Sequence, residues 1–150
     1  MILTRVLELD QVEAASVLMW KSFYYSNKDS STLSGFEFFR DKTQTAVLQY
    51  EMLYNGLKLI GAFDADELMG VCAFKEQRII LLFVSKENQN KGVGLRLLNE
   101  ALAEIKGDVY LDSSLSALGF YLKQGFSSCG EKSFENGIMT QPMVLKRADN

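Results

Sequence analysis

Apolar and polar residues follow one another along the chain in two periods, one typical of strands and one typical of helices. Residues 79–84 are continuously apolar, which predicts a strand covered on both faces. Residues 91–105 carry apolar side chains at helical spacing with polar residues between them, which predicts an amphipathic helix. A turn at Gly107-Asp108 leads into another strand at residues 109–111. A strand, a helix and a strand within about 35 residues indicate a right-handed parallel crossover.

The remaining segments predict a group of helices and two hairpins. Asp10, with Glu13 three residues later, is typical of a capping box, and Asn55-Gly56 is typical of a left-handed helix stop. We expect a strand at Leu3–Leu9, a helix from Asp10 to about Tyr25, a loop at Ser26–Ser34, a helix at Gly35–Tyr54, strands at Leu57–Phe63 and Leu68–Lys75, a short helix at Ser116–Lys123, and strands at Phe126–Phe134 and Ile138–Lys146.

The order of these elements is β-α-α-β-β-β-α-β-α-β-β. It predicts an α+β fold with a mixed central sheet of about seven strands flanked by about four helices. The last two strands are separated by Asn136-Gly137, a strong hairpin signal. A doubly wound fold is disfavoured, because only one crossover unit is visible. The chain shows no repeat or linker, so we expect a single domain over residues 1–150.

Composition narrows the class of protein. Hydrophobic residues make up 47% of the chain and charged residues 23%, as in a globular domain, and no apolar run approaches the ~20 residues of a membrane helix. Cys72 and Cys129 have no disulfide or metal spacing, which predicts a reducing cytoplasm. The net charge is −3 without a basic block, so we expect no nucleic-acid partner. The absence of histidine excludes Ser-His-Asp and Cys-His chemistry in their usual forms, and we expect no metal.

The segment Gln89-Asn90-Lys91-Gly92-Val93-Gly94 is the strongest candidate for a binding site. It lies between the apolar strand and the amphipathic helix. A helix start presents free backbone N–H groups, and the helix dipole there favours anions. Glycine allows close approach of a phosphate to the backbone. The segment therefore predicts a site for a phosphate-bearing cofactor.

Two nucleotide-binding motifs fit this segment poorly. A P-loop ends in Gly-Lys-Ser/Thr, but Leu95 follows Gly94. A dinucleotide-binding fingerprint has a third glycine where this chain has Leu97. Asp112 lies about 20 residues further on, as the acidic residue of that fingerprint would. The loop at Ser85–Lys91 is nevertheless too long for its tight turn.

Two motifs together resemble the GNAT superfamily of N-acetyltransferases, in an uncharacterised bacterial type. Gln89-x-x-Gly92-x-Gly94 matches its Q/R-x-x-G-x-G/A signature, and residues 117–126 (ALGFYLKQGF) resemble its A-x-x-F-Y-x-x-x-G-F signature. With the order of elements, the resemblance covers nearly the whole chain. It implies an enzyme that uses acetyl-CoA and acetylates a primary amine of a small molecule or peptide by direct attack in a ternary complex. Many relatives dimerise, so a homodimer remains open.

The resemblance also implies positions for acetyl-CoA. Backbone N–H groups of the loop would bind the pyrophosphate, and the pantetheine arm would pair with the backbone of Phe83 and Val84, which needs a splay between two strands. Lys91 would add a charged contact or remain a solvated lysine. Ser114 stands where the family often has Asn; it and Ser116 would bond pantetheine or cap the next helix. The implied cofactor-binding residues are Leu82, Phe83, Val84, Gln89, Asn90, Lys91, Gly92, Val93, Gly94, Leu95, Ser114, Ser116 and Tyr121.

The implied catalytic groups are few. Tyr121 stands where the family places its general acid, with a half-buried helix aromatic as the alternative, and the Val84 N–H would bind the oxyanion. The general base is open between Glu76, Asp112 and a water chain. The first two helices hold Trp20, Phe23, Tyr24, Tyr25, Phe36 and Phe39. Most of these should be core residues, and Tyr24 and Tyr25 are the candidates for the substrate pocket.

Two other functions remain open. A non-catalytic CoA-binding regulatory or interaction module would bind acetyl-CoA without transferring the acetyl group; the missing obvious base and Ser114 motivate it. Another phosphate-ligand binder would prefer a nucleotide to acetyl-CoA.

Overall fold

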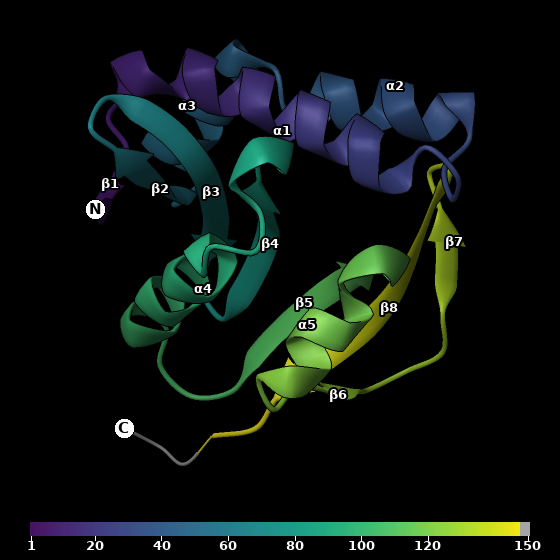
Figure 1. Cartoon of the computed structure of the whole chain (residues 1–150). Helices are drawn as coiled ribbons and strands as arrows, with labels where there is room; N and C mark the ends of the chain where they lie inside the picture. The colour runs from purple at the N-terminus through teal and green to yellow at the C-terminus, as the bar shows by residue number, and fades with distance from the viewer. Residues whose placement is uncertain (148–150) are drawn as a thin grey trace.

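A computed structural model describes residues 1–147 as one mixed β-sheet between two layers of helices (Figure 1). Within that range the chain forms eight strands and five α-helices. The strand order is β1-β2-β3-β4-β5-β8-β6, and β7 pairs with β8. Helices α1, α2 and α3 cover one face of the sheet, while α4 and α5 cover the other.

The strands are β1 (Ile2–Val6), β2 (Lys58–Asp64), β3 (Glu67–Lys75), β4 (Arg78–Val84), β5 (Val109–Ser114), β6 (Ser127–Ser128), β7 (Ser133–Glu135) and β8 (Ile138–Leu145). The helices are α1 (Val12–Asn27), α2 (Leu33–Lys42), α3 (Thr45–Tyr54), α4 (Val93–Glu104) and α5 (Leu118–Lys123). The α+β class and the mixed sheet predicted from the sequence are confirmed, with one strand and one helix more than expected.

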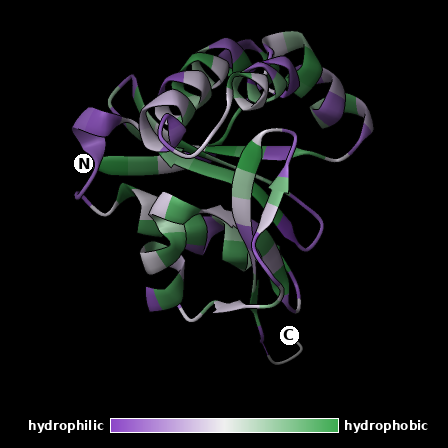
Figure 2. Cartoon of the chain, turned by 90° about the vertical axis from the view of Figure 1, so that its right-hand side faces the viewer, coloured by the Kyte–Doolittle hydropathy of each residue, from purple (hydrophilic) through white to green (hydrophobic). Residues whose placement is uncertain are grey.

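Each face of the sheet carries its own hydrophobic core. Leu97 and Leu98 of α4 are fully buried in the cluster on one face, and Leu48 of α3 lies in the cluster on the other. Figure 2 shows the hydrophobic strands between the two helical layers. From Leu81 onward the residues of β4 pack alternately against the two clusters, which explains a continuously apolar run in place of an alternating one, whereas Ile80 is 49% exposed.

Two helices stand where a single helix was predicted at residues 35–54. The break is at Thr43, whose N–H and hydroxyl both bond to the Phe39 carbonyl, and Gln44 is extended with φ −61° and ψ 146°. Ser16 of α1 donates to the Thr43 carbonyl at 2.6 Å. The capping box predicted at Asp10 and Glu13 was also misplaced: Glu8 and Gln11 form it, at a 3-10 turn (Leu9–Gln11) that leads into α1.

The predicted strand at residues 126–134 is two strands, β6 and β7, which both pair with β8. Pro142 interrupts the ladder between them. It accepts a bond from the Cys129 N–H at 3.0 Å but has no N–H of its own to donate. The hairpin predicted at Asn136-Gly137 is confirmed, and both residues have positive φ.

The neighbouring strands β4 and β5 separate after a single pair. They run parallel and are joined by α4, as the crossover prediction required. Arg78 pairs with Tyr110, and within residues 1–147 no further pair joins the two strands. On the other edge of β4, Leu81 faces Ala73 and Ile79 faces Phe74, so Ile80 is an extra residue that forms a β-bulge. A bulge bends a strand and increases its twist, which carries β4 away from β5.

Candidate functional site

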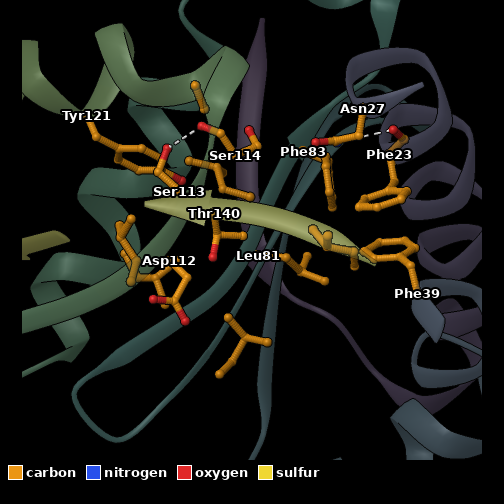
Figure 3. A pocket seen from close by; sticks show the side chains of 16 residues that line it. Phe23, Asn27, Phe39, Leu81, Phe83, Asp112, Ser113, Ser114, Tyr121 and Thr140 are labelled. Carbon is orange, nitrogen blue, oxygen red and sulfur yellow. Dashed lines mark hydrogen bonds between the residues drawn. The ribbon is translucent and has the colours of Figure 1, made fainter. Parts of the chain in front are cut away.

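Two cavities meet at the gap between β4 and β5. The loop-side cavity, of about 680 Å³, opens toward the loop at residues 89–94. The helix-side cavity, of about 210 Å³, lies between the two strands and helices α1 and α2 (Figure 3). Five residues line both cavities: Leu82, Phe83, Ser114, Ala117 and Tyr121. A ligand in one cavity could therefore contact a ligand in the other beside these five residues.

The backbone of β4 presents amide groups to the gap. The Ser85 N–H donates to the Met69 carbonyl of β3 at 2.9 Å. Hydrogen-bonded residues alternate along an antiparallel pair, so the Phe83 backbone bonds to β3, while Leu82 and Val84 turn their N–H and carbonyl groups the other way. Since the only β4–β5 pair in the described chain lies at the far end of β4, these groups face the gap.

The loop after β4 places free N–H donors beside the same gap. Asn90 has φ 64° and Gly92 has φ 81°, the left-handed conformation that glycine adopts without strain. The first hydrogen bond of α4 runs from the Arg96 N–H to the Gly92 carbonyl, so the N–H groups of residues 93–95 have no partner within the helix. No side chain caps this helix. The arrangement is suited to an anion.

The protein does not fill the space beside the Cα atom of Gly94. A Cβ at this position would lie 3.6 Å from the Val84 side chain and 3.7 Å from the Phe120 ring, which are ordinary contacts. Gly94 also lines the loop-side cavity, together with Gln89 and Asn90. The space beside Gly94 is therefore available to a ligand.

The polar side chains of the loop are held by neighbouring groups. The Gln89 side chain donates to the Val84 carbonyl at 3.3 Å. Lys91 donates to the buried Asn88 side chain at 3.2 Å, and the Asn88 amide in turn donates to Ser85 and Glu67. Of the predicted loop residues, Gln89, Asn90 and Gly94 line the loop-side cavity, whereas Lys91, Gly92, Val93 and Leu95 do not.

Tyr121 lies at the junction of the two cavities. Its side chain is 6% exposed and packs edge-on against Phe120 and Phe126. Burial raises the pKa of the Tyr121 phenol above its usual value, and the nearby Cys72 adds to the rise. Burial likewise raises the pKa of the Cys72 thiol to about 12. The phenol therefore keeps its proton at neutral pH and can act as a hydrogen-bond donor.

Ser114 is the last residue of β5, and Ser116 lies two residues further on. Their hydroxyls lie 3.3 Å apart, and both residues line the loop-side cavity. Ser114 has the backbone conformation of a helix N-cap, but its side chain makes no capping bond. The Ser114 hydroxyl therefore has no capping role and lies beside that of Ser116 in the wall of the cavity.

Tyr24 and Tyr25, the two tyrosines predicted for the substrate pocket, do not line the helix-side cavity. Tyr25 lines the loop-side cavity, and its ring lies 4.4 Å from the Lys86 ammonium. Tyr24 lies on the outer side of α1 and lines neither of the two cavities. Instead Phe23 and Asn27, one helical turn apart, face the helix-side cavity. Their i, i+4 spacing indicates that both side chains lie on the same face of α1, but the sequence does not show that this face borders a cavity.

Of Glu76 and Asp112, the two carboxylates considered as general base, only Asp112 lines a cavity of the site. Glu76 lies in the β3–β4 turn with φ 53° and lines neither cavity of the site. Asp112 lines the helix-side cavity, but its carboxylate forms an ion pair with Arg78 at 3.3 Å. Both partners of the pair are about half exposed, with side-chain exposures of 49% and 53%.

Over residues 1–147, acidic and cysteine side chains do not gather into a group that could hold a metal ion. In the same range no helix is both long and apolar enough to cross a membrane.

The sequence matches a known family over most of its length. A family model described as "Acetyltransferase (GNAT) domain" matches residues 27–147. A curated relative, the tRNA(Met) cytidine acetyltransferase TmcA of Saccharolobus islandicus, is 36% identical over 84 residues. The match includes 53% of this chain and spans only 10% of that relative's length.

Solved structures share the whole fold. The PaiA N-acetyltransferase of Thermoplasma acidophilum, in complex with coenzyme A, has a TM-score of 0.81 at 21% identity, covering 98% of this chain and 99% of that one. A GCN5-related N-acetyltransferase from Rhodopseudomonas palustris has a TM-score of 0.83 at 16% identity, covering 97% and 95%. At these identities the likeness concerns the fold.

Proposed function

The chain belongs to the GNAT family of acetyltransferases, and we propose that it transfers the acetyl group of acetyl-CoA directly to a primary amine of a small molecule or peptide. The observation that carries this proposal is the position of Tyr121, a buried phenol at the junction of two cavities. One cavity would take the donor and the other the acceptor.

The loop-side cavity fits acetyl-CoA. The unpartnered N–H groups at the start of α4 would bind the pyrophosphate, and the space beside Gly94 would let it approach the backbone. The exposed amide groups of Leu82 and Val84 would pair with an extended pantetheine arm, as a further strand would. The hydroxyls of Ser114 and Ser116 border the same cavity and would bond to the arm from the β5 side.

Bound acetyl-CoA supplies an activated acetyl thioester. The Val84 N–H, directed into the gap, would donate to the thioester oxygen as negative charge develops there. The amine nitrogen forms the new C–N bond while the C–S bond breaks. Tyr121 would donate to the departing sulfur. Burial raises the proton affinity of the departing sulfur as it raises that of the phenolate, so the two effects offset each other, and Tyr121 would regain its proton from water after CoA leaves.

The amine must also lose a proton. Within residues 1–147, Asp112 is the only carboxylate that lines the helix-side cavity, and it is engaged in an ion pair with Arg78 at 3.3 Å. We therefore assign this proton to water at the mouth of the cavity.

The free thiols of Cys72 and Cys129 support a cytoplasmic location. No Lys or Arg lines the helix-side cavity within the described chain, which favours a small amine or peptide over the tRNA named for the curated relative.

Calorimetric titration with acetyl-CoA tests the proposal, with ATP and NAD as control ligands. Selective micromolar binding is expected, followed by release of CoA thiol when amines are added. A folded sample that binds no acetyl-CoA, or prefers a nucleotide, would contradict it. Binding without transfer to any amine would favour a regulatory CoA-binding module, for which the missing free carboxylate is the supporting observation.

A further inference from the structure

The helix-side cavity has an aromatic end and a polar end. Phe23 and Phe39 stack with their ring centroids 3.9 Å apart, and Phe83 packs edge-on against both. Figure 3 shows these rings together on the side of α1 and α2. Tyr121 of α5 and the polar residues of β5 and β8, among them Ser113 and Thr140, lie on the opposite side. A molecule that spans the cavity thus meets most of the polar groups at one end, and Asn27 is the polar residue at the other.

Charge in this cavity is nearly absent. Of the sixteen residues that line it, ten are apolar and Asp112 alone is charged. That carboxylate is neutralised by Arg78 at 3.3 Å. A carboxylate or phosphate on the acceptor would find no cation and would lose its hydration, which is costly. A polyamine would find no free carboxylates for its additional ammonium groups.

Asn27 offers one further polar contact. The residue is 2% exposed, and its side-chain N–H donates to the Phe23 carbonyl at 3.2 Å. This bond uses one of the two side-chain N–H groups and leaves the oxygen and the second N–H available to the cavity. Asn27 therefore suits an acceptor that carries a small uncharged polar group.

The helix-side cavity is small. Its volume of about 210 Å³ is below the range of about 300–1,000 Å³ that is typical of ligand pockets. We infer, on the basis of the proposed acetyl transfer, that the acceptor is a compact primary amine with an uncharged apolar body, aromatic or branched aliphatic, and without a carboxylate or phosphate. Its amine group lies beside Tyr121 and its body lies against Phe23 and Phe39.

Matched amines test this inference at saturating acetyl-CoA. 2-Phenylethylamine and phenylalanine share the same body, and only phenylalanine has a carboxylate; spermidine and a glycine tripeptide represent polyamines and peptides. We expect kcat/KM for 2-phenylethylamine to exceed that of the other three by at least ~10-fold. A preference for any of the other three would overturn the inference and leave acetyl transfer intact. Failure of acetyl-CoA binding would instead overturn the proposed function.

Binding provides a second readout if no amine in the panel reacts. 2-Phenylethylamine and phenylalanine are then titrated into the protein loaded with CoA. Tighter binding of 2-phenylethylamine is expected, and equal or weaker binding would overturn the inference.

Two neighbouring phenylalanines in α2 give a matched pair of variants. Phe39 lines the cavity, whereas Phe38 does not line it and lies 5.6 Å from the Lys42 ammonium. Phe39→Leu should lower kcat/KM for 2-phenylethylamine by roughly 3–10-fold and change that for isobutylamine less than about twofold, because only the aromatic substrate loses ring contacts. Phe38→Leu should change neither value. An equal loss for both amines in Phe39→Leu would indicate a merely structural role and count against the inference.

Discussion

Gly35 in α2 and Gly137 in the β7–β8 turn are in backbone contact. A Cβ on Gly35 would overlap the Gly137 carbonyl oxygen, and a Cβ on Gly137 would overlap the Gly35 nitrogen. The Thr32 N–H also donates to the Gly137 carbonyl, at 3.1 Å. This contact joins α2 to the hairpin whose next residue, Ile138, lines the helix-side cavity. It therefore fixes one wall of the proposed acceptor site.

Gly35→Ala should separate these two segments. The methyl group would meet backbone atoms, which cannot move aside as a flexible side chain can. We expect a loss of about 1–3 kcal/mol in the free energy of unfolding and a higher KM for the acceptor, with the Kd of acetyl-CoA unchanged. Urea unfolding and steady-state kinetics measure these quantities.

Gly119→Ala in α5 is the control for that variant. Nothing lies within 4 Å of the position of its Cβ, so its stability should be unchanged or higher by up to about 1 kcal/mol. Equal effects of the two substitutions would contradict the role given to the Gly35–Gly137 contact.

Gly94→Asp should separate binding from stability, with Gly94→Ala as its control. The free protein has room for a Cβ at this position, alanine favours a helix by up to about 1 kcal/mol over glycine, and the Q/R-x-x-G-x-G/A signature admits alanine here. Gly94→Ala should therefore keep both the melting temperature and the affinity for acetyl-CoA. An aspartate in the first turn of a helix is favourable for the helix dipole, but its carboxylate would repel the phosphate proposed for this space, so Gly94→Asp should keep most of the stability and lower the affinity. Calorimetry and thermal unfolding on the same sample test both parts, and unchanged affinity in Gly94→Asp would show that no anion approaches Gly94.

Tyr121→Phe should lower turnover and spare binding. Removing a general acid costs about 10²- to 10⁴-fold in kcat, while the ring still packs against Phe120 and Phe126. The Kd of acetyl-CoA should change little. Tyr110→Phe on β5 is the matched control, because Tyr110 lines neither cavity of the site. Undiminished turnover in Tyr121→Phe at saturating substrates would exclude the acid role.

The pH profile adds a check on the same residue. A raised pKa means that the phenol stays protonated to a higher pH than a free tyrosine, whose pKa is about 10. The kcat of the parent protein should therefore show no loss from phenol ionisation up to about pH 10. A fall of kcat near pH 9 that is absent in Tyr121→Phe would contradict the burial of this group.

Arg147→Ala should destabilise the fold. The Arg147 guanidinium donates to the carbonyls of Leu102, Ile105 and Gly107, and so binds the end of α4 and the turn after it. Hydrogen bonds of charged groups contribute about 1.5–3 kcal/mol, and we expect a loss of about that size in urea unfolding. The neighbouring Lys146→Ala should cost clearly less than Arg147→Ala, because the Lys146–Asp108 pair is a surface salt bridge. A larger effect at Lys146 would reverse this assignment.

The sequence predicted those parts of the site that local rules determine. The helix start after residues 89–94 depends on glycine conformation and on an amphipathic pattern, and the turn at Asn136-Gly137 depends on two residues with positive φ. Both are short-range signals. The family resemblance rested on the same loop and on Tyr121, and the family match confirms it.

Long-range contacts determined what the sequence could not predict. The break between α2 and α3 is stabilised by the bond from Ser16 to Thr43, with neither proline nor glycine to mark it. The bulge at Ile80 lies inside a continuously apolar run, where an extra residue leaves no visible trace. Phe39 was expected in the core, and its place in the cavity wall depends on how α2 packs against α1 and β4.

The early separation of β4 from β5 has a consequence for self-association. A strand edge without a partner is elsewhere a point at which a second chain can add and aggregation can begin. β4 has such an edge at Leu82 and Val84, but it lies within the sheet, bordered by Ser114 and Tyr121. An extended ligand that pairs with these amides removes the edge altogether. If the proposed function holds, recognition of the ligand and protection against intermolecular pairing would be two results of one stretch of backbone that β5 leaves unpaired.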